Sequence, residues 1–361
     1  MAVYKTAIPA EPEPTQTFRM IQKGMVIKMS GVTKVEKKVL SSDGIHQLAG
    51  WVYLPDGPAR GLLQVVHGMT EYIGRYDSFM TRMAGEGYIC FGYDHLGHGY
   101  TASHPGGDGP DGDTPSELGF IASRDGWLRL AEDVGRFAAA VREVYGRTDA
   151  GETLPWFLLG HSMGSFIVRV SSARFAKPDK LILMGTGGPN PASGAGLALV
   201  GLTKCFRGER YISPLIDKLT FGSYNSHFRE ENDPLSWLTT DRTVRDRYRE
   251  DPLCTFKFTV SAMGDLIRLN RAANSRACFK ALGGGMPVLL LSGRDDPVGA
   301  YGKGVTIVYN RLKRQGAEGK LVLYDHGRHE ILNDTCREAA VGEILAFLAA
   351  PGTATAGDGA E

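Results

Sequence analysis

The stretch Gly160-His161-Ser162-Met163-Gly164 decides the fold that we predict for this chain of 361 residues. It has the pattern G-x-S-x-G, in which a serine stands on a sharp turn from a strand to a helix. The apolar run at residues 156–159 predicts the strand before it. Because glycine is abundant in this chain, the pattern identifies Ser162 as a nucleophile only if a carboxylate and then a histidine follow at strand ends.

The two glycines have a physical role at such a turn. The backbone of the serine is strained there, and side chains two residues before and after it would collide with the neighbouring strand and helix. Ser162 Oγ would then project above the carboxyl edge of the sheet, beside the N-terminus of the next helix, whose dipole favours a developing anion.

Short apolar runs separated by helix-like stretches continue this pattern along the chain. They are residues 62–66, 88–93, 156–159, 181–184, 288–291 and 321–324. Runs that are apolar throughout are expected for parallel strands buried on both faces. The clearest helix is residues 127–144, with apolar side chains about 3.6 residues apart. An antiparallel hairpin at residues 35–40 and 47–54 precedes them. The sequence therefore predicts an α/β fold, with a mostly parallel central sheet flanked by helices.

The alternation of strands and helices stops for roughly a hundred residues, which hold several helical stretches but no clear strand. Segments rich in glycine and proline stand at both ends of this stretch and suit hinges. We therefore predict a helical cap inserted into the core. The predicted parts are an N-terminal arm (1–30), the first part of the core (31–186), the helical cap (187–285), the second part of the core (286–350) and a disordered tail (351–361).

A serine hydroxyl needs activation by a histidine that a carboxylate orients. Asp295 and Asp296 follow the last strand but one, and His326 and His329 follow the last strand. The order serine, aspartate, histidine suits hydrolases built on such a sheet. From the residues alone, Asp295 and His326 compete with Asp296 and His329, since a small error of register exchanges them. The spacing around His329 is not that of a zinc peptidase, and we predict no metal.

The composition limits the partners and the compartment. The chain has 41 lysines and arginines and 40 aspartates and glutamates, so its charge does not attract nucleic acid or an anionic membrane. Its five cysteines are widely spaced and contain no C-x-x-C pair, which indicates a reducing compartment. The first 18 residues lack the apolar region of a signal peptide, and no apolar run is long enough to cross a bilayer. We therefore predict a cytoplasmic protein, and the sequence leaves its oligomeric state open.

Five short motifs, the G-x-S-x-G pattern among them, are spread over most of the chain in a consistent order. They are residues 67–76 (HGMTEYIGRY), 94–99 (DHLGHG), 160–164 (GHSMG), 295–298 (DDPV) and 329–330 (HE). With them the sequence resembles the α/β-hydrolase superfamily, and more narrowly its monoacylglycerol lipase and lysophospholipase-like branch of the serine aminopeptidase S33 type. The resemblance spans about residues 35–348 and implies the α/β-hydrolase fold.

The resemblance also implies roles for particular residues. It makes Ser162 the nucleophile, Asp296 the acid and His329 the base. Backbone amides that hold the oxyanion are placed at Met69 and Met163. No cofactor is implied.

Glu71 and Arg75 match residues that in monoacylglycerol lipases lie around the polar end that receives glycerol. The resemblance thus implies a substrate-binding site at Glu71 and Arg75, and the alternative is a salt bridge within the loop. Near its start the predicted cap contains the apolar segment 194–202. In this family the corresponding region meets lipid or a membrane surface, which implies transient, peripheral membrane contact through the cap. The alternative for this segment is a core helix.

The sequence therefore predicts a serine hydrolase that cleaves carboxylic esters of single-chain lipids, monoacylglycerols or lysophospholipids, through an acyl-enzyme. One alternative is a carboxylesterase for small esters or a thioesterase on the same scaffold, since the fold does not separate these activities. The alternative from another class is a ligand-binding protein without catalysis. A dehalogenase or an epoxide hydrolase would need aspartate at position 162, so the serine argues against both.

Overall fold

The computed structural model describes residues 25–29, 31–102 and 116–351. The predicted arm (1–30) and tail (351–361) lie almost entirely outside these residues. The part of the arm that is described forms a strand, β1 (Val26–Met29), that the sequence did not predict.

A central sheet runs through the described part of the chain. Its strands are β1, β2 (Val32–Leu40), β3 (Gln47–Pro55), β4 (Gly61–Val66), β5 (Tyr88–Tyr93), β6 (Trp156–His161), β7 (Lys180–Met184), β8 (Pro287–Gly293) and β9 (Glu318–Tyr324). Their order in space is β1-β2-β3-β5-β4-β6-β7-β8-β9. Pairing is antiparallel from β1 to β5 and parallel from β5 to β9. The prediction of a mostly parallel sheet is confirmed, and each predicted apolar run lies within a strand.

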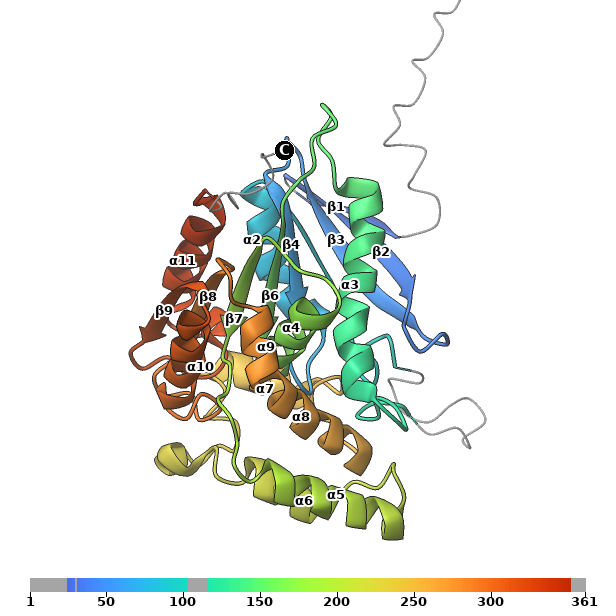
Figure 1. Ribbon diagram of the computed structural model, residues 1–361, viewed down its shortest axis with the longest axis vertical. Helices are drawn as coiled ribbons and strands as arrows, with labels where there is room; N and C mark the ends of the chain where they lie inside the picture. Colours follow the sequence, from blue (N-terminus) through green and yellow to red (C-terminus); the bar gives the residue numbers. More distant parts are fainter. Residues whose placement is uncertain (1–24, 30, 103–115, 352–361) are drawn as a thin grey trace, which may run out of the picture.

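Helices cover both faces of the sheet (Figure 1). They are α2 (Asp77–Gly85), α3 (Gly126–Tyr145), α4 (Met163–Arg174), α5 (Ser193–Arg207), α6 (Pro214–Phe221), α7 (Arg242–Glu250), α8 (Val260–Ala273), α9 (Arg276–Ala281), α10 (Lys303–Arg314) and α11 (Arg337–Ala349), with short 3-10 helices η1 (Ile73–Tyr76), η2 (Ser226–Glu231) and η3 (Ile331–Asn333). Helices α3, α4 and α8 to α10 form one apolar layer with the sheet, and α2 and α11 form the other. Among the described residues, no helix is both long and apolar enough to span a bilayer.

The stretch between β7 and β8, predicted as the cap, contains two kinds of helix. Helices α5 and α6 lie apart from the sheet, at the lower end of Figure 1. Helices α8 and α9 instead pack on α4, because α8 buries apolar side chains such as Met263 and Leu269 there. The end of the predicted range (187–285) therefore belongs to the layer that covers the sheet. In α5 only Ser193 and Val200 are buried, so it is not the core helix of the alternative interpretation.

Candidate active site

Ser162 lies on the turn between β6 and α4 with φ 53° and ψ −121°, a backbone conformation that L-residues rarely adopt. A Cβ atom on Gly160 would lie 2.4 Å from the carbonyl oxygen of Gly164. One on Gly164 would lie 2.2 Å from the carbonyl oxygen of Val66. Both distances are shorter than atoms tolerate, so both positions require glycine. The turn therefore has the strand, the strain and the helix that the sequence motif predicts.

His329 and Asp296 are brought together at the carboxyl edge of the sheet. His329 Nδ1 lies 3.0 Å from Asp296 Oδ1, and both side chains are buried. The Val298 amide donates to Asp296 Oδ1 at 2.8 Å, which holds the carboxylate in place. The competing residues lie elsewhere, since Asp295 is partly exposed and His326 is exposed. With the Nδ1 proton donated to Asp296, the Nε2 atom of His329 is left as the acceptor.

Ser162 and His329 line one cavity of about 610 Å³. The volume lies within the range of small-molecule sites, about 300–1,000 Å³. Apolar and aromatic side chains form much of its wall, among them Phe166, Trp237, Leu238, Leu266 and Ile267. The cavity thus places the candidate nucleophile at the wall of an apolar chamber.

Met69 and Met163 line the same cavity. The loop that carries Met69 lies against the start of helix α4 at Ser162. A Cβ atom on Gly68 would lie only 3.0 Å from Ser162 Cβ. The Gly68 amide donates to Glu71 Oε1 at 2.5 Å, which fixes the loop. The amides of Met69 and Met163, by contrast, donate to no acceptor within the described part of the chain. Two unengaged donors beside a nucleophile are what an oxyanion site requires.

Glu71 and Arg75 belong to a buried polar cluster. Arg75 Nη1 lies 3.1 Å from Glu71 Oε2, and the guanidinium donates to both oxygens of Glu330 at 2.5 and 2.7 Å. It also lies over the ring of Tyr248, 4.9 Å from its centre. Two carboxylates therefore engage the cation, which supports the alternative of a loop salt bridge. Glu71 also lines the cavity.

His161 is a residue of this site that the sequence analysis did not single out. Its Nδ1 lies 3.1 Å from Glu71 Oε1, and its Nε2 lies 3.2 Å from the carbonyl oxygen of His329. Burial opposes the charged imidazolium, but the hydrogen bond and charge of Glu71 raise the pKa of His161 above its usual value. Burial likewise opposes the carboxylate, but the bond and charge of His161 hold the pKa of Glu71 well below its usual range.

His161 therefore joins the loop that carries Met69 and Glu71 to the backbone of the candidate base. The only signal in the sequence was its place beside Ser162 in the pentapeptide.

Arg75→Met is expected to lower the free energy of unfolding by about 3–5 kcal/mol, because Glu71 and Glu330 would stay buried without their cation. Denaturant unfolding measures this. The matched control is Arg82→Met, whose pair with Glu86 is exposed and is worth at most about 1 kcal/mol. If Arg75→Met is as stable as the wild type and binds glycerol esters more weakly, with no change for other esters, the guanidinium binds substrate.

Comparison with known proteins gives a consistent family of relatives. The family model described as serine aminopeptidase, S33, matches residues 57–336. A monoacylglycerol lipase of Mycolicibacterium smegmatis is 25% identical over 305 residues, which cover 82% of this chain and 91% of the lipase. The monoglyceride lipase of Homo sapiens is 24% identical over 334 residues, 88% of this chain and 91% of the lipase.

Among solved structures, a thermostable carboxyl esterase from Bacillus coagulans in complex with glycerol is similar, with a TM-score of 0.77. It is 26% identical, and the match covers 87% of this chain and 99% of the esterase. These likenesses confirm the predicted fold and the predicted resemblance.

Proposed function

Because the chain belongs to the serine aminopeptidase S33 family of α/β-hydrolases, we propose that it is a serine hydrolase that cleaves carboxylic esters of single-chain lipids through an acyl-enzyme. One observation carries the proposal: the strained Ser162 and His329, whose imidazole is paired with the buried Asp296, line one largely apolar cavity. The relatives that are monoacylglycerol lipases support the substrate class.

In the proposed reaction, Ser162 Oγ attacks the ester carbonyl carbon and His329 Nε2 takes its proton. The amides of Met69 and Met163 stabilise the resulting oxyanion. The intermediate collapses, the C–O bond breaks, and His329 gives the proton to the leaving alcohol. Water then attacks the acyl carbon while His329 takes one of its protons. The bond between the acyl carbon and Ser162 Oγ breaks, His329 returns the proton to Ser162 Oγ, and the fatty acid is released. Asp296 holds the imidazole in place and stabilises its charged form. The proposed reaction needs no cofactor.

The charges around the cavity favour a neutral alcohol over a phosphate head group. Two carboxylates, those of Glu71 and Glu330, line the cavity and share Arg75. Arg249 and Lys257 also line it, and each is paired with aspartate. Among these residues every cation is already paired with a carboxylate, so a phosphate in the cavity would be repelled by carboxylates without gaining a free cation. We therefore propose monoacylglycerols as substrates in preference to lysophospholipids.

The experiment that tests this function compares hydrolysis of a chain-length series of monoacylglycerols with that of lysophosphatidylcholine, short aryl esters and acyl thioesters. Under the proposal, long monoacylglycerols have the highest kcat/KM. Turnover of short esters or thioesters alone would favour the general esterase or thioesterase, an alternative that the likeness to a carboxyl esterase supports. Binding of these lipids without turnover would indicate a protein that binds ligands without catalysis.

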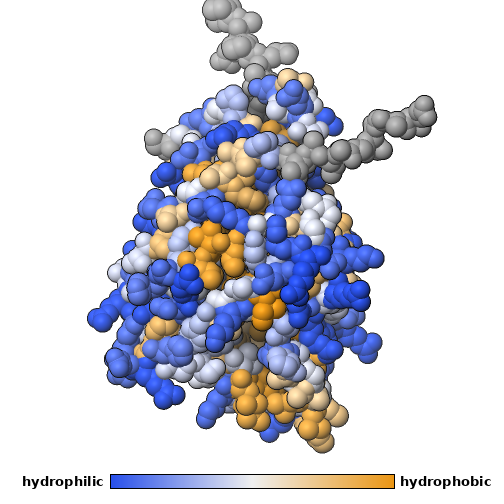
Figure 2. Space-filling model, turned by 60° about the vertical axis from the view of Figure 1, so that its left-hand side comes forward, coloured by the Kyte–Doolittle hydropathy of each residue, from blue (hydrophilic) through white to orange (hydrophobic). Residues whose placement is uncertain are grey.

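The cap exposes an apolar surface that suits contact with lipid. Its large exposed side chains are Leu202, Phe206, Ile212, Leu215 and Leu219. They lie on or between α5 and α6, and Figure 2 shows hydrophobic side chains gathered at this lower end of the molecule. We propose that this surface rests transiently on a lipid layer while the substrate enters.

Replacing Leu215 and Leu219 together by glutamate is expected to weaken binding to phosphatidylcholine vesicles by at least about 10-fold, since two apolar side chains would no longer enter the interface. Hydrolysis of a short, water-soluble ester should stay unchanged. Co-sedimentation with vesicles measures the binding. Ile307→Glu, an exposed position on α10, is the control. Equal vesicle binding by the double variant and by the control would contradict the proposed surface.

The proposed location is the cytoplasm, peripheral to membranes. All five cysteines lie within the described residues and are free thiols: Cys90, Cys205, Cys254, Cys278 and Cys336. Free thiols are typical of a reducing compartment, and this supports the proposal.

A further inference from the structure

The loop that carries His329 is docked on residues 231–245 of the insertion, which we call the docking segment. The His329 amide donates to the carbonyl oxygen of Trp237 at 3.4 Å, and the Glu330 amide donates to that of Leu238 at 2.8 Å. The rings of Trp237 and His329 lie 5.2 Å apart between centres. The candidate base therefore touches the docking segment through both its backbone and its ring.

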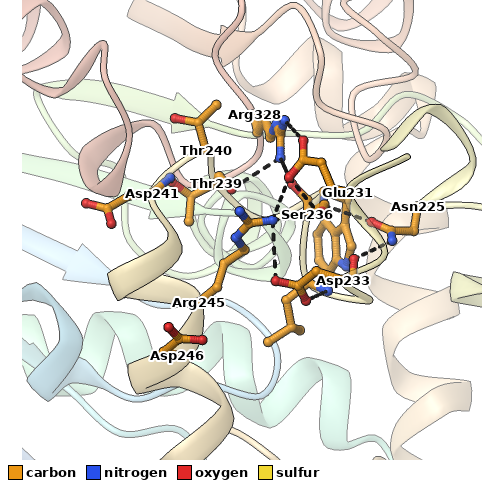
Figure 3. A network of polar contacts seen from close by, with 12 residues as sticks. Asn225, Glu231, Asp233, Ser236, Thr239, Thr240, Asp241, Arg245, Asp246 and Arg328 are labelled. Atoms are coloured by element: carbon orange, nitrogen blue, oxygen red, sulfur yellow. Dashed lines mark hydrogen bonds and ion pairs between the residues drawn. The ribbon is translucent and has the colours of Figure 1, made fainter. Parts of the chain in front are cut away.

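The residue before the base carries the strongest of these contacts. Arg328 Nη1 donates to the carbonyl oxygen of Ser236 at 2.6 Å, and Nη1 and Nη2 each contact an oxygen of Glu231, the first at 3.2 Å (Figure 3). The guanidinium also lies over the ring of Phe228, 4.2 Å from its centre. Only 9% of Arg328 is exposed, so the docking segment and Phe228 together enclose this cation.

A second arginine holds the same carboxylate from the other side. Arg245, on α7, donates through Nη1 to Glu231 Oε2 at 2.8 Å and to Ser236 Oγ at 2.6 Å. The hydrogen bond from Arg328 is the main cause that lowers the pKa of Glu231 to about 2. Burial alone would raise this pKa. Glu231 is therefore a carboxylate at any pH near neutrality and joins the two cations.

We propose that Arg328 is a positioning residue for His329, and that Glu231 and Arg245 complete the joint through which it acts. This inference rests on the proposed function, in which His329 is the base. Arg328 is bonded covalently to the backbone of His329, so the distance between the imidazole and Asp296 depends on where the guanidinium is anchored. A displacement of about 1 Å in a catalytic group can cost about 100-fold in rate.

The inference also assigns a role to this part of the insertion. Residues 231–245 help to hold the loop of His329 in position. If the cap opens without disturbing His329, these residues must stay in place.

The test compares Arg328→Met, Arg328→Lys and Glu231→Gln with the wild type. The matched control is Asp325→Asn. Asp325 lies on the same loop as Arg328, and this change removes its exposed ion pair with Arg294, which follows β8. For each protein three properties are measured: kcat and KM for a monoacylglycerol, the melting temperature, and the low-field proton resonance of the His329 Nδ1–H bonded to Asp296. Loss of that resonance in His329→Gln assigns it.

Arg328→Met and Glu231→Gln are each expected to lower kcat by about 100-fold with little change in KM, and to shift or broaden the resonance well below their melting temperatures. Arg328→Lys keeps the charge but not the paired contact, so its loss should be intermediate. The double variant Arg328→Met, Glu231→Gln should be little worse than either single one, because both break one joint. Asp325→Asn should match the wild type.

A lower melting temperature with unchanged kcat and an unchanged resonance would overturn the inference, because the joint would then serve stability alone. If Arg328→Met does not fold, Arg328→Lys and Glu231→Gln decide the matter by the same readouts. If the wild type hydrolyses no ester, the proposed function fails, while the resonance still shows whether Arg328 positions His329.

Discussion

Ser162→Ala is expected to lower kcat for ester hydrolysis by about a million-fold while the protein folds and binds substrate as before. The reaction proposed here begins with a bond between Ser162 Oγ and the acyl carbon, and alanine has no atom that can form it. The strained backbone at this position, with φ 53°, accepts alanine as it accepts serine, so stability should be preserved.

Two measurements separate this result from unfolding. The variant should fail to react with a fluorophosphonate probe that labels the wild type, and it should keep the melting temperature of the wild type. The matched control is Ser171→Ala, a buried serine on helix α4, which begins directly after Ser162; this variant should retain labelling and turnover. Turnover by Ser162→Ala above about a thousandth of the wild-type rate would contradict the role of Ser162.

His329→Gln should cause a loss of similar size, about a million-fold in kcat, because the nucleophile and its base act as one unit. Glutamine can occupy the space next to Asp296, but it cannot take the proton from Ser162 and return it to the leaving alcohol. The test is steady-state hydrolysis of a monoacylglycerol, together with the rate of fluorophosphonate labelling.

The control for this variant is His326→Gln, three residues earlier on the same loop and exposed. It should leave both rates unchanged. The double variant Ser162→Ala, His329→Gln should be no slower than either single variant, since each already disables the unit. A large loss in His326→Gln with activity retained in His329→Gln would reverse the assignment of the base.

The elements that carry the site were predictable because their signals are local. Strands buried on both faces are apolar throughout, and the structure extends each predicted run by at most three residues at either end. The turn at Ser162 was predictable for the same reason, since Gly160 and Gly164 lie within two residues of the strained backbone. Strand β1 escaped prediction because it is only four residues long and its side chains are mostly exposed, so no alternation of buried and exposed residues marks it.

The choice between neighbouring residues was not local. Asp295 and Asp296 are adjacent in a turn, and their local pattern does not distinguish them. The resemblance to the family implied Asp296, and in the structure Asp296 is the one buried against His329, 33 residues later. The extent of the insertion was equally hidden. Helices α5 and α8 both follow loops and both have apolar residues, but only α8 packs on α4 within the layer that covers the sheet.

The sequence by itself determined the class of fold, the order of the strands along the chain, the serine turn and the family, because periodicity and glycine placement are properties of neighbouring residues. Tertiary structure alone decided the contacts that join distant loops. Arg75 meets Glu330 across 255 residues, and Arg328 meets Glu231 across 97. Such pairs leave no periodic trace in a sequence, since they form only when the sheet brings loop ends to one edge and excludes water from between them.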